Sequence, residues 1–240
     1  MMFKKIVGFG DSWMWGDELL NPTLVDHPYA HPVLDENTPY RESHCFLGLL
    51  GQHYGVPTEN FGIAGGSMQS SIWTYLWWIE HETLPLDDCL VLVAHTDPDR
   101  LTFYNPRHIH MVNDPPWNKF VHSAWVHSGA DCFGPEWNDM VKRFFVLSNC
   151  NALQKLNAQQ TVLFFDGQSH AMNHNVLQFY SMYPHYRFDV DSMLWPDQSL
   201  AHIVGEDRAL YAPDGHPNEK GHVVISNQLI IEIDRAIINA

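Results

Sequence analysis

The chain has 240 residues, with 13 Lys and Arg against 28 Asp and Glu, so its formal net charge is −15 with His neutral. An apolar fraction of 45% with 13% aromatic residues excludes a generally disordered chain. Such an acidic surface repels phosphate groups, which argues against nucleic acid and anionic membranes as partners. No apolar run approaches the ~20 residues of a membrane-spanning helix. The first residues also lack the pattern of a secretory signal, so we expect a cytoplasmic protein.

Four short apolar segments predict β-strands. They are residues 4–9, 59–63, 89–94 and 161–165. Three of them (KIVGF, CLVLVA and TVLFF) are near-continuous runs of β-branched, aliphatic or aromatic residues. Runs of this kind are typical of strands that are covered on both faces in a parallel sheet.

Helical patterns lie between and after these strands, over residues 67–82, 137–157 and 221–238. In the first, Tyr75 and Leu76 share a predicted apolar face with Ile72 and Ile79. In the last, the residues one turn apart are Val224, Gln228 and Ile231. Alternating strands and helices predict a three-layer α/β/α sandwich with a central parallel sheet, in one domain over residues 1–240.

Three stretches depart from this alternation. Residues 21–41 are rich in Pro, His and Asp and predict a loop, and residues 182–214 are irregular as well. Residues 98–134 form a long, aromatic, proline-containing insertion. A loop of this length is often a lid or a binding segment, although an insertion packed on the surface has the same composition.

A serine follows the first strand, in Gly10-Asp11-Ser12. Open parallel sheets bind ligands at the carboxyl ends of their strands, so the Ser12 hydroxyl is a candidate nucleophile. The same tripeptide also suits an ordinary turn or helix N-cap, and in that role Asp11 would support the loop.

A histidine precedes the last helix, in Asp214-Gly215-His216-Pro217. An imidazole on a loop can take the proton of a hydroxyl, and a carboxylate two residues earlier can orient it. A Pro/Gly turn with no catalytic role is the alternative.

Two further polar segments follow the second and third strands. Residues 60–67 (NFGIAGGS) form a glycine-rich turn whose backbone N–H groups could hold an oxyanion or a phosphate, although no Walker-type Gly-Lys-Ser/Thr follows. Residues 94–97 (AHTD) end the third strand.

Together these four segments resemble, in order, the conserved blocks of the SGNH (GDSL-type) hydrolases. The resemblance implies Ser12 as nucleophile, Gly65 as the oxyanion-hole glycine and His216 as base. It also implies the flavodoxin-like α/β/α fold of that family. Some stretches, such as GDSWMWGDEL and APDGHPNEKGH, are similar to members encoded by tailed phages, which would allow a virion-associated protein or release by lysis.

Two positions depart from the family pattern. Thr96 stands where the family usually has the Asn of Gly-x-Asn-Asp, so one rotatable hydroxyl would replace an amide donor to the oxyanion. Pro213 stands three residues before His216, where the family has Asp, and Asp214 lies two residues before it. Either Asp214 orients His216 or a backbone carbonyl does so in a Ser-His dyad.

Other residues are weaker candidates. Trp13, His95 and Asp97 could contact substrate, although packing is the simpler role for Trp13, and Asp166 ends the fourth strand. Two histidine pairs have spacings that a metal could use, His108 with His110 and His170 with His174. Neither pair has a Glu or Cys partner at a recognised spacing, and the four cysteines include no Cys-x-x-Cys pair.

The sequence therefore predicts a serine esterase or deacylase that hydrolyses a short acyl ester, such as an O-acetylated carbohydrate, without metal or cofactor. Its binding partner would be a small-molecule or carbohydrate ester. The sequence leaves open whether the protein forms a homo-oligomer. The first alternative is a carbohydrate-binding or virion-associated module that keeps the fold without turnover, because of Thr96 and the displaced Asp214. The second is a His-ligated metallohydrolase.

Overall fold

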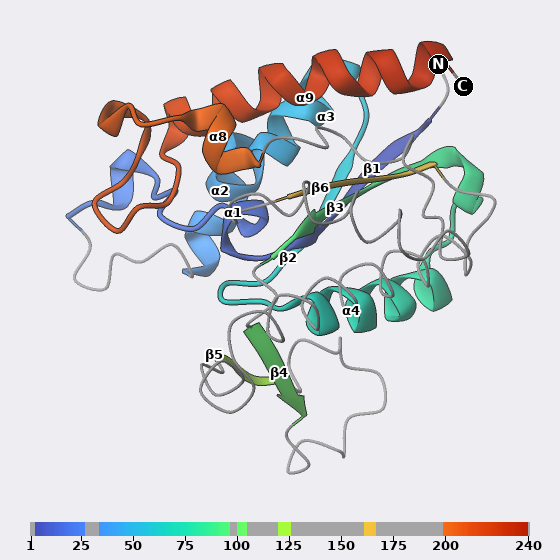
Figure 1. The fold of residues 1–240 in the computed structure, drawn as a ribbon, viewed down its shortest axis with the longest axis horizontal. Helices are drawn as coiled ribbons and strands as arrows, with labels where there is room; N and C mark the ends of the chain where they lie inside the picture. Colours follow the sequence, from blue (N-terminus) through green and yellow to red (C-terminus); the bar gives the residue numbers. More distant parts are fainter. Residues whose placement is uncertain are drawn as a thin grey trace, which may run out of the picture.

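A four-stranded parallel sheet forms the centre of the structure, a computed structural model that describes residues 3–26, 34–96, 100–104, 120–125, 161–166 and 199–239 (Figure 1). The strand order is β2-β1-β3-β6. The strands are β1 (Lys5–Gly10), β2 (Thr58–Gly62), β3 (Cys89–His95) and β6 (Thr161–Asp166). Each boundary falls within one residue of its predicted position, so the four predicted strands are confirmed.

Six helices lie in the described part of the chain. They are α1 (Ser12–Trp15), α2 (Thr38–His44), α3 (Phe46–Tyr54), α4 (Met68–His81), α8 (Leu200–Val204) and α9 (Glu219–Asn239). Short 3-10 turns occur at Pro22–Leu24, Asp35–Asn37, Leu86–Asp88 and Arg208–Leu210. Helices α4 and α9 confirm two predicted helices, and the predicted helix over 137–157 lies outside the described residues.

Strands β1 and β3 are buried on both faces, as their sequences predict. Successive side chains of β1 point to opposite faces, so Ile6 packs with the residues of α3, α8 and α9, whereas Val7 and Phe9 pack under α4. In Figure 1, α3, α8 and α9 lie on one side of the strands and α4 lies on the other. The three-layer α/β/α architecture is therefore confirmed.

The predicted apolar face of α4 is confirmed except at Leu76. Tyr75 is buried, and Ile72 and Ile79 are partly buried against the same core cluster. Leu76 is exposed, whereas Tyr75 and Trp78 are almost completely buried. The indole N–H of Trp78 lies within hydrogen-bond distance of Glu59 and Glu82, at 3.1 and 2.9 Å. Trp78, a large ring whose N–H is paired, thus occupies a buried position that the predicted face had not included.

The buried face of α9 is rotated from the predicted one. The predicted face contains Ile231, which is 45% exposed. The buried residues are Ile225, Leu229 and Ile233, each of which is 0% exposed. Helix α9 has apolar residues on more than one face, and only its position above α3 selects the stripe that is covered.

Residues 21–41 were predicted to be a loop, and this prediction is wrong at its C-terminal end. Helix α2 begins at Thr38, and the preceding turn is held by Asn37, which is completely buried. The Asn37 side chain accepts a hydrogen bond from the Asn21 N–H and donates one to the Leu19 carbonyl, each at 2.8 Å. These long-range bonds order a segment whose composition is typical of a loop.

Helix α3 has no counterpart among the predicted elements. Its sequence, FLGLLGQHY, contains two glycines, which lower helix propensity. A Cβ atom at Gly48 would lie 1.9 Å from the Glu42 carbonyl oxygen, so the turn between α2 and α3 requires glycine there. The residue that weakens the helical pattern is thus the one that allows the close packing.

Part of the 98–134 insertion forms an antiparallel pair, β4 (Arg100–Tyr104) with β5 (Phe120–Trp125). This pair lies at the α4 side of the sheet (Figure 1). The remainder of the insertion is outside the described residues, so its role as a lid stays a prediction. None of the described helices has the length and hydropathy needed to cross a membrane.

Candidate active site

Ser12 lies where the central strand β1 turns into α1. Asp11 is the N-cap of this helix, and its carboxylate accepts a hydrogen bond of 3.0 Å from the Trp13 N–H. Both Asp11 and Ser12 are buried. The strand, the cap and the first helical residue therefore fix the position of the Ser12 side chain at the carboxyl edge of the sheet.

The loop before α9 brings His216 to Ser12, across 204 residues of sequence. His216 Nε2 lies 2.8 Å from Ser12 Oγ, and His216 Nδ1 lies 2.5 Å from Asp214 Oδ2. The other oxygen of Asp214 accepts a 3.0 Å hydrogen bond from the His216 N–H. With a proton on Nδ1, Nε2 is free to accept the Ser12 proton, as a catalytic triad requires. The two-residue spacing of Asp214 is thus compatible with orienting the ring.

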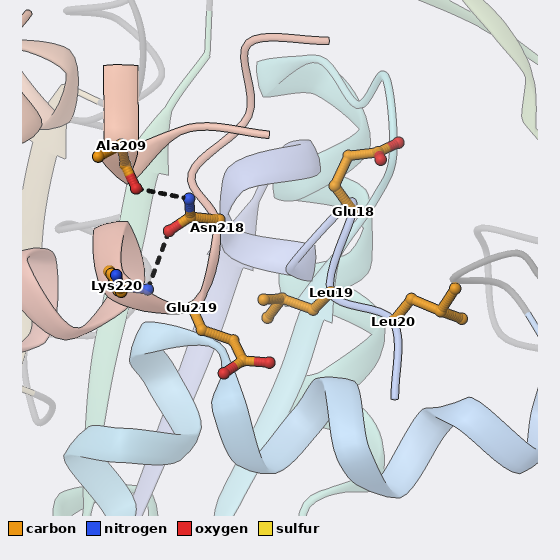
Figure 2. A pocket seen from close by; sticks show the side chains of 7 residues that line it. All are labelled: Glu18, Leu19, Leu20, Ala209, Asn218, Glu219 and Lys220. Carbon is orange, nitrogen blue, oxygen red and sulfur yellow. Dashed lines mark hydrogen bonds between the residues drawn. The ribbon is translucent and has the colours of Figure 1, made fainter. Parts of the chain in front are cut away.

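Asn218 holds the histidine loop in place. Its side-chain oxygen accepts hydrogen bonds from Lys220 N–H and Gly221 N–H at the start of α9, at 3.0 and 3.2 Å. Its side-chain amide donates to the Ala209 carbonyl at 2.9 Å (Figure 2). The His216 carbonyl also accepts a backbone bond of 2.8 Å from the Ala212 N–H. The loop is therefore tied to the turn before it and to the helix after it.

The glycine-rich turn lies next to the end of β1. The Ile63 N–H donates to the Gly10 carbonyl at 3.0 Å, and Gly66 packs against the same carbonyl. Gly65 has a φ of 69°, a left-handed conformation that glycine adopts at little cost. The predicted oxyanion-hole turn thus contacts Gly10, and Gly10 lies two residues before the predicted nucleophile Ser12 in the chain.

Thr96 is buried and directly follows β3, the other neighbour of β1. Phe9 pairs with Val93 in the parallel register of β1 and β3. Strands β1 and β3 therefore end at the same edge of the sheet, where Ser12 and Thr96 each follow their own strand. The structure thus brings Thr96 to the edge that carries Ser12, and its role as an oxyanion donor stays a prediction.

Three residues were predicted to contact substrate, and the structure describes them to different extents. Trp13 is 7% exposed and packs edge to face on Tyr211, with ring centroids 6.4 Å apart, so its ring belongs to the core. His95 ends β3, and Asp97 lies outside the described residues. Contacts of these three residues with substrate stay predictions.

A fully buried histidine near the site was not predicted to have a role. His222 accepts a 3.2 Å hydrogen bond at Nδ1 from the Phe46 N–H, and its ring stacks on that of Phe46. Burial, together with the nearby charge of His216, lowers the pKa of His222 to about 3. The ring is therefore neutral at physiological pH. Its apolar neighbours in α9 were visible in the sequence, but its contact with α3 was not.

A cavity of about 290 Å³ lies beside the histidine loop, between the segment after α1 and the start of α9 (Figure 2). It is lined by Glu18, Leu19, Leu20, Ala209, Asn218, Glu219 and Lys220. Burial raises the pKa of Tyr40 to about 12, together with the hydrogen bond between its hydroxyl and Glu219. This wall of the cavity is thus attached to α2.

Within the described ranges, no group of three His, Cys, Asp or Glu side chains could hold a metal ion. Both histidine pairs named from the sequence, at 108 and 110 and at 170 and 174, lie outside those ranges. Cys45 and Cys89 are buried free thiols, and burial is the main cause that raises the pKa of each.

No protein-family model matches the chain, and no curated protein matches it. Solved structures do match. An acetyl xylan esterase from Butyrivibrio proteoclasticus is 12% identical, covers 99% of this chain and 64% of its own, and gives a TM-score of 0.58. A family two carbohydrate esterase from Cellvibrio japonicus is 13% identical, with coverages of 97% and 61% and a TM-score of 0.53. A lipolytic protein of the G-D-S-L family from Veillonella parvula is 13% identical, with coverages of 94% and 96% and a TM-score of 0.44.

The chain therefore has the fold of the SGNH hydrolases, which confirms the resemblance at the level of the fold. It spans less than two thirds of the length of the two carbohydrate esterases. The narrower likeness to phage-encoded members stays a prediction.

Proposed function

We propose that the protein is a serine esterase that hydrolyses short acyl esters, with Ser12 as nucleophile, His216 as general base and acid, and Asp214 as the group that orients His216. The observation that carries this proposal is the contact of 2.8 Å between Ser12 Oγ and His216 Nε2, combined with the contact of 2.5 Å between His216 Nδ1 and Asp214. A nucleophile, a base and an orienting acid in hydrogen-bond reach of one another are the geometric signature of this chemistry.

The reaction proceeds in two halves. His216 Nε2 takes the proton of Ser12 as Oγ attacks the ester carbonyl, and Asp214 stabilises the imidazolium that forms. His216 then gives the proton to the alcohol oxygen as the bond to the alcohol breaks, which leaves an acyl group on Ser12. In the second half, His216 takes a proton from water, the hydroxide oxygen attacks the acyl carbon, and the proton returns to Ser12 as the carboxylic acid is released.

We infer that the oxyanion is bound by the backbone N–H groups of Ser12 and Gly65, with the Thr96 hydroxyl as third donor. Support comes from the position of the glycine turn against Gly10 and from the pairing of β1 with β3, which makes Ser12 and Thr96 follow neighbouring strands at one edge of the sheet. One donor of this kind contributes about 3–4 kcal/mol to transition-state stabilisation. A hydroxyl at position 96 can supply part of that contribution.

An O-acetylated carbohydrate is the substrate class that we favour. Several solved structures that share the fold with TM-scores above 0.5 are described as carbohydrate or acetyl xylan esterases, at 12–13% identity. This likeness supports the choice of substrate to test first. The negative charge of the chain further favours neutral over anionic substrates.

The test is hydrolysis of p-nitrophenyl acetate and butyrate, with chelator present, by wild type, Ser12→Ala and His216→Ala. His53→Ala, which changes an exposed histidine on α3, is the matched control. We expect turnover by wild type and control, loss in both site variants, and an acetyl adduct on Ser12 detectable by mass spectrometry.

Three outcomes would contradict the proposal. Activity that persists in both site variants would place the reaction elsewhere, and activity that disappears with chelator would favour a metallohydrolase. Saccharide binding that survives Ser12→Ala, with no turnover of any ester by wild type, would favour a binding module.

A further inference from the structure

Asp17 lies at the same nitrogen of His216 that faces Ser12. Helix α1 ends at Gly16, which has a φ of 83°, and the N–H groups of Gly16 and Asp17 both donate to the Ser12 carbonyl, at 3.0 and 2.9 Å. This turn reverses the chain and returns the Asp17 side chain toward the start of α1. Asp17 Oδ2 lies 3.9 Å from His216 Nε2. Asp17 was not predicted to be a site residue, because nothing in its spacing from Ser12 marks it.

The turn that carries Asp17 is anchored from α2. Arg41 is buried, and its Nη1 donates a hydrogen bond of 2.7 Å to the Trp15 carbonyl. Its guanidinium also lies 3.9 Å above the Trp15 ring. Oδ1 of Asp17 accepts a hydrogen bond of 3.2 Å from the Glu18 N–H. The carboxylate therefore accepts a local backbone hydrogen bond, and Arg41 anchors the turn before it at Trp15.

The position beside Nε2 is where the alcohol oxygen must lie when it takes its proton. That oxygen has to come within about 3 Å of Nε2 for proton transfer. At 3.9 Å, Asp17 Oδ2 is too far from Nε2 for a hydrogen bond but borders on this position. An ionised carboxylate can only accept hydrogen bonds, so the group it binds there must be a donor. A hydroxyl on the carbon next to the esterified one is a donor at the right place.

We propose that Asp17 binds the alcohol half of the substrate by accepting a hydrogen bond from a hydroxyl adjacent to the ester. This inference rests on the esterase function proposed above. The site then selects monoesters of neutral polyols that keep a free neighbouring hydroxyl, and it disfavours alcohols that carry a carboxylate or phosphate at that carbon. The side chains of Asp17 and His216 are each about one fifth exposed, so a bound alcohol can reach both groups.

The expected selectivity follows from the cost of an unsatisfied acceptor. A fully buried polar site rejects an analogue that lacks the donor by about 10⁴-fold or more. Asp17 is only partly buried, so we expect a preference of about 10-fold to 100-fold for the hydroxyl-bearing ester.

The test uses 2-hydroxyethyl acetate and 2-methoxyethyl acetate. The neighbouring oxygen carries a hydrogen-bond donor in the first ester and a methyl group, which cannot donate, in the second. We compare the ratio of kcat/KM values for the two esters in wild type, Asp17→Ala and Glu42→Ala. Glu42 is the control because its carboxylate also lies near Arg41, at 3.8 Å, but on α2 away from His216. We expect a ratio of about 10 or more in wild type and in the control, and a ratio near one in Asp17→Ala.

A wild-type ratio near one would overturn the inference, as would an equal loss on both esters in Asp17→Ala, because the carboxylate would then act on the imidazole or on the fold alone. Failure of the esterase function is a different result: wild type would hydrolyse neither ester nor p-nitrophenyl acetate, or Ser12→Ala would retain activity. The inference would then fall with it.

Discussion

Two histidines six residues apart in the chain have opposite environments. His216 is partly exposed, with Asp214 at one ring nitrogen and Ser12 at the other. His222 is fully buried on α9, accepts a hydrogen bond from the Phe46 N–H, and has no described partner at Nε2. The first ring is placed to exchange protons, whereas burial keeps the second neutral.

The difference shows that position in the fold, not residue type, assigns the chemistry. A carboxylate beside the ring and partial exposure suit His216 to the proposed role of base. The partner of His222 is instead an N–H group in the first turn of α3, where helical N–H groups lack partners within the helix. His222 thus joins α9 to α3 in the core, whereas His216 lies on the loop before α9 and contacts Ser12.

The largest expected effect is on catalysis by His216→Ala. Removal of the base lowers kcat/KM for p-nitrophenyl acetate by about 10³-fold or more, because triad residues act as a unit. The ring is on a partly exposed loop, so the melting temperature is expected to shift by only about 2 °C. Steady-state kinetics and thermal unfolding measure the two effects. Near-normal kcat/KM in this variant would remove His216 from the mechanism.

His222→Ala is expected to show the reverse pattern. The variant leaves a cavity beside Phe46 and removes the acceptor of its N–H group, so the free energy of unfolding falls by about 2–4 kcal/mol. Urea unfolding followed by circular dichroism measures this loss. For the fraction that remains folded, kcat/KM changes less than in His216→Ala. A loss of activity equal to that of His216→Ala with unchanged stability would show that the two histidines do not differ as described.

Asp214→Asn tests whether the Asp214 carboxylate orients His216. Loss of the carboxylate leaves the imidazolium less stabilised and lets the ring adopt the wrong tautomer. Because the Asp214 side chain is 40% exposed, we expect kcat/KM to fall by about 10-fold to 100-fold, less than for a buried triad acid. Asp207→Asn is the matched control, since Asp207 also accepts a hydrogen bond from an N–H two residues later but has no histidine partner among the residues that the structure describes. An unchanged kcat/KM would favour a Ser-His dyad.

The smallest effect concerns the pH dependence of stability. The pKa of His222 is about 3 in the folded state and about 6.5 when unfolded, so the unfolded chain binds the extra proton first as pH falls. Stability contributed by the neutral ring is therefore fully present above pH 6.5 and is lost toward pH 3, by at most about 1.4 kcal/mol per pH unit. Unfolding free energies of wild type and His222→Gln between pH 7 and 5 test this. Equal slopes in the two proteins would contradict it.

The sequence by itself determined the strands and the positions of the candidate groups along the chain. Buried parallel strands need continuous apolar runs, and those at β1, β3 and β6 are unambiguous. Polar residues directly after strands in a parallel sheet must meet at one edge, so Ser12, Gly65 and Thr96 could be grouped without coordinates. His216 was assigned by resemblance, because no local rule ties a loop after residue 210 to the first strand.

Only the tertiary structure decided which surfaces and partners these elements have. The faces of α4 and α9 depend on which neighbour covers them, and α2 and α3 are held by Asn37, Arg41 and a close approach at Gly48. The contact of Asp214 with His216 depends on the turn that their loop adopts, and that of Asp17 depends on the reversal after Gly16. Local patterns report propensity and burial, whereas these contacts join groups whose separation in space is set by the packing of distant segments.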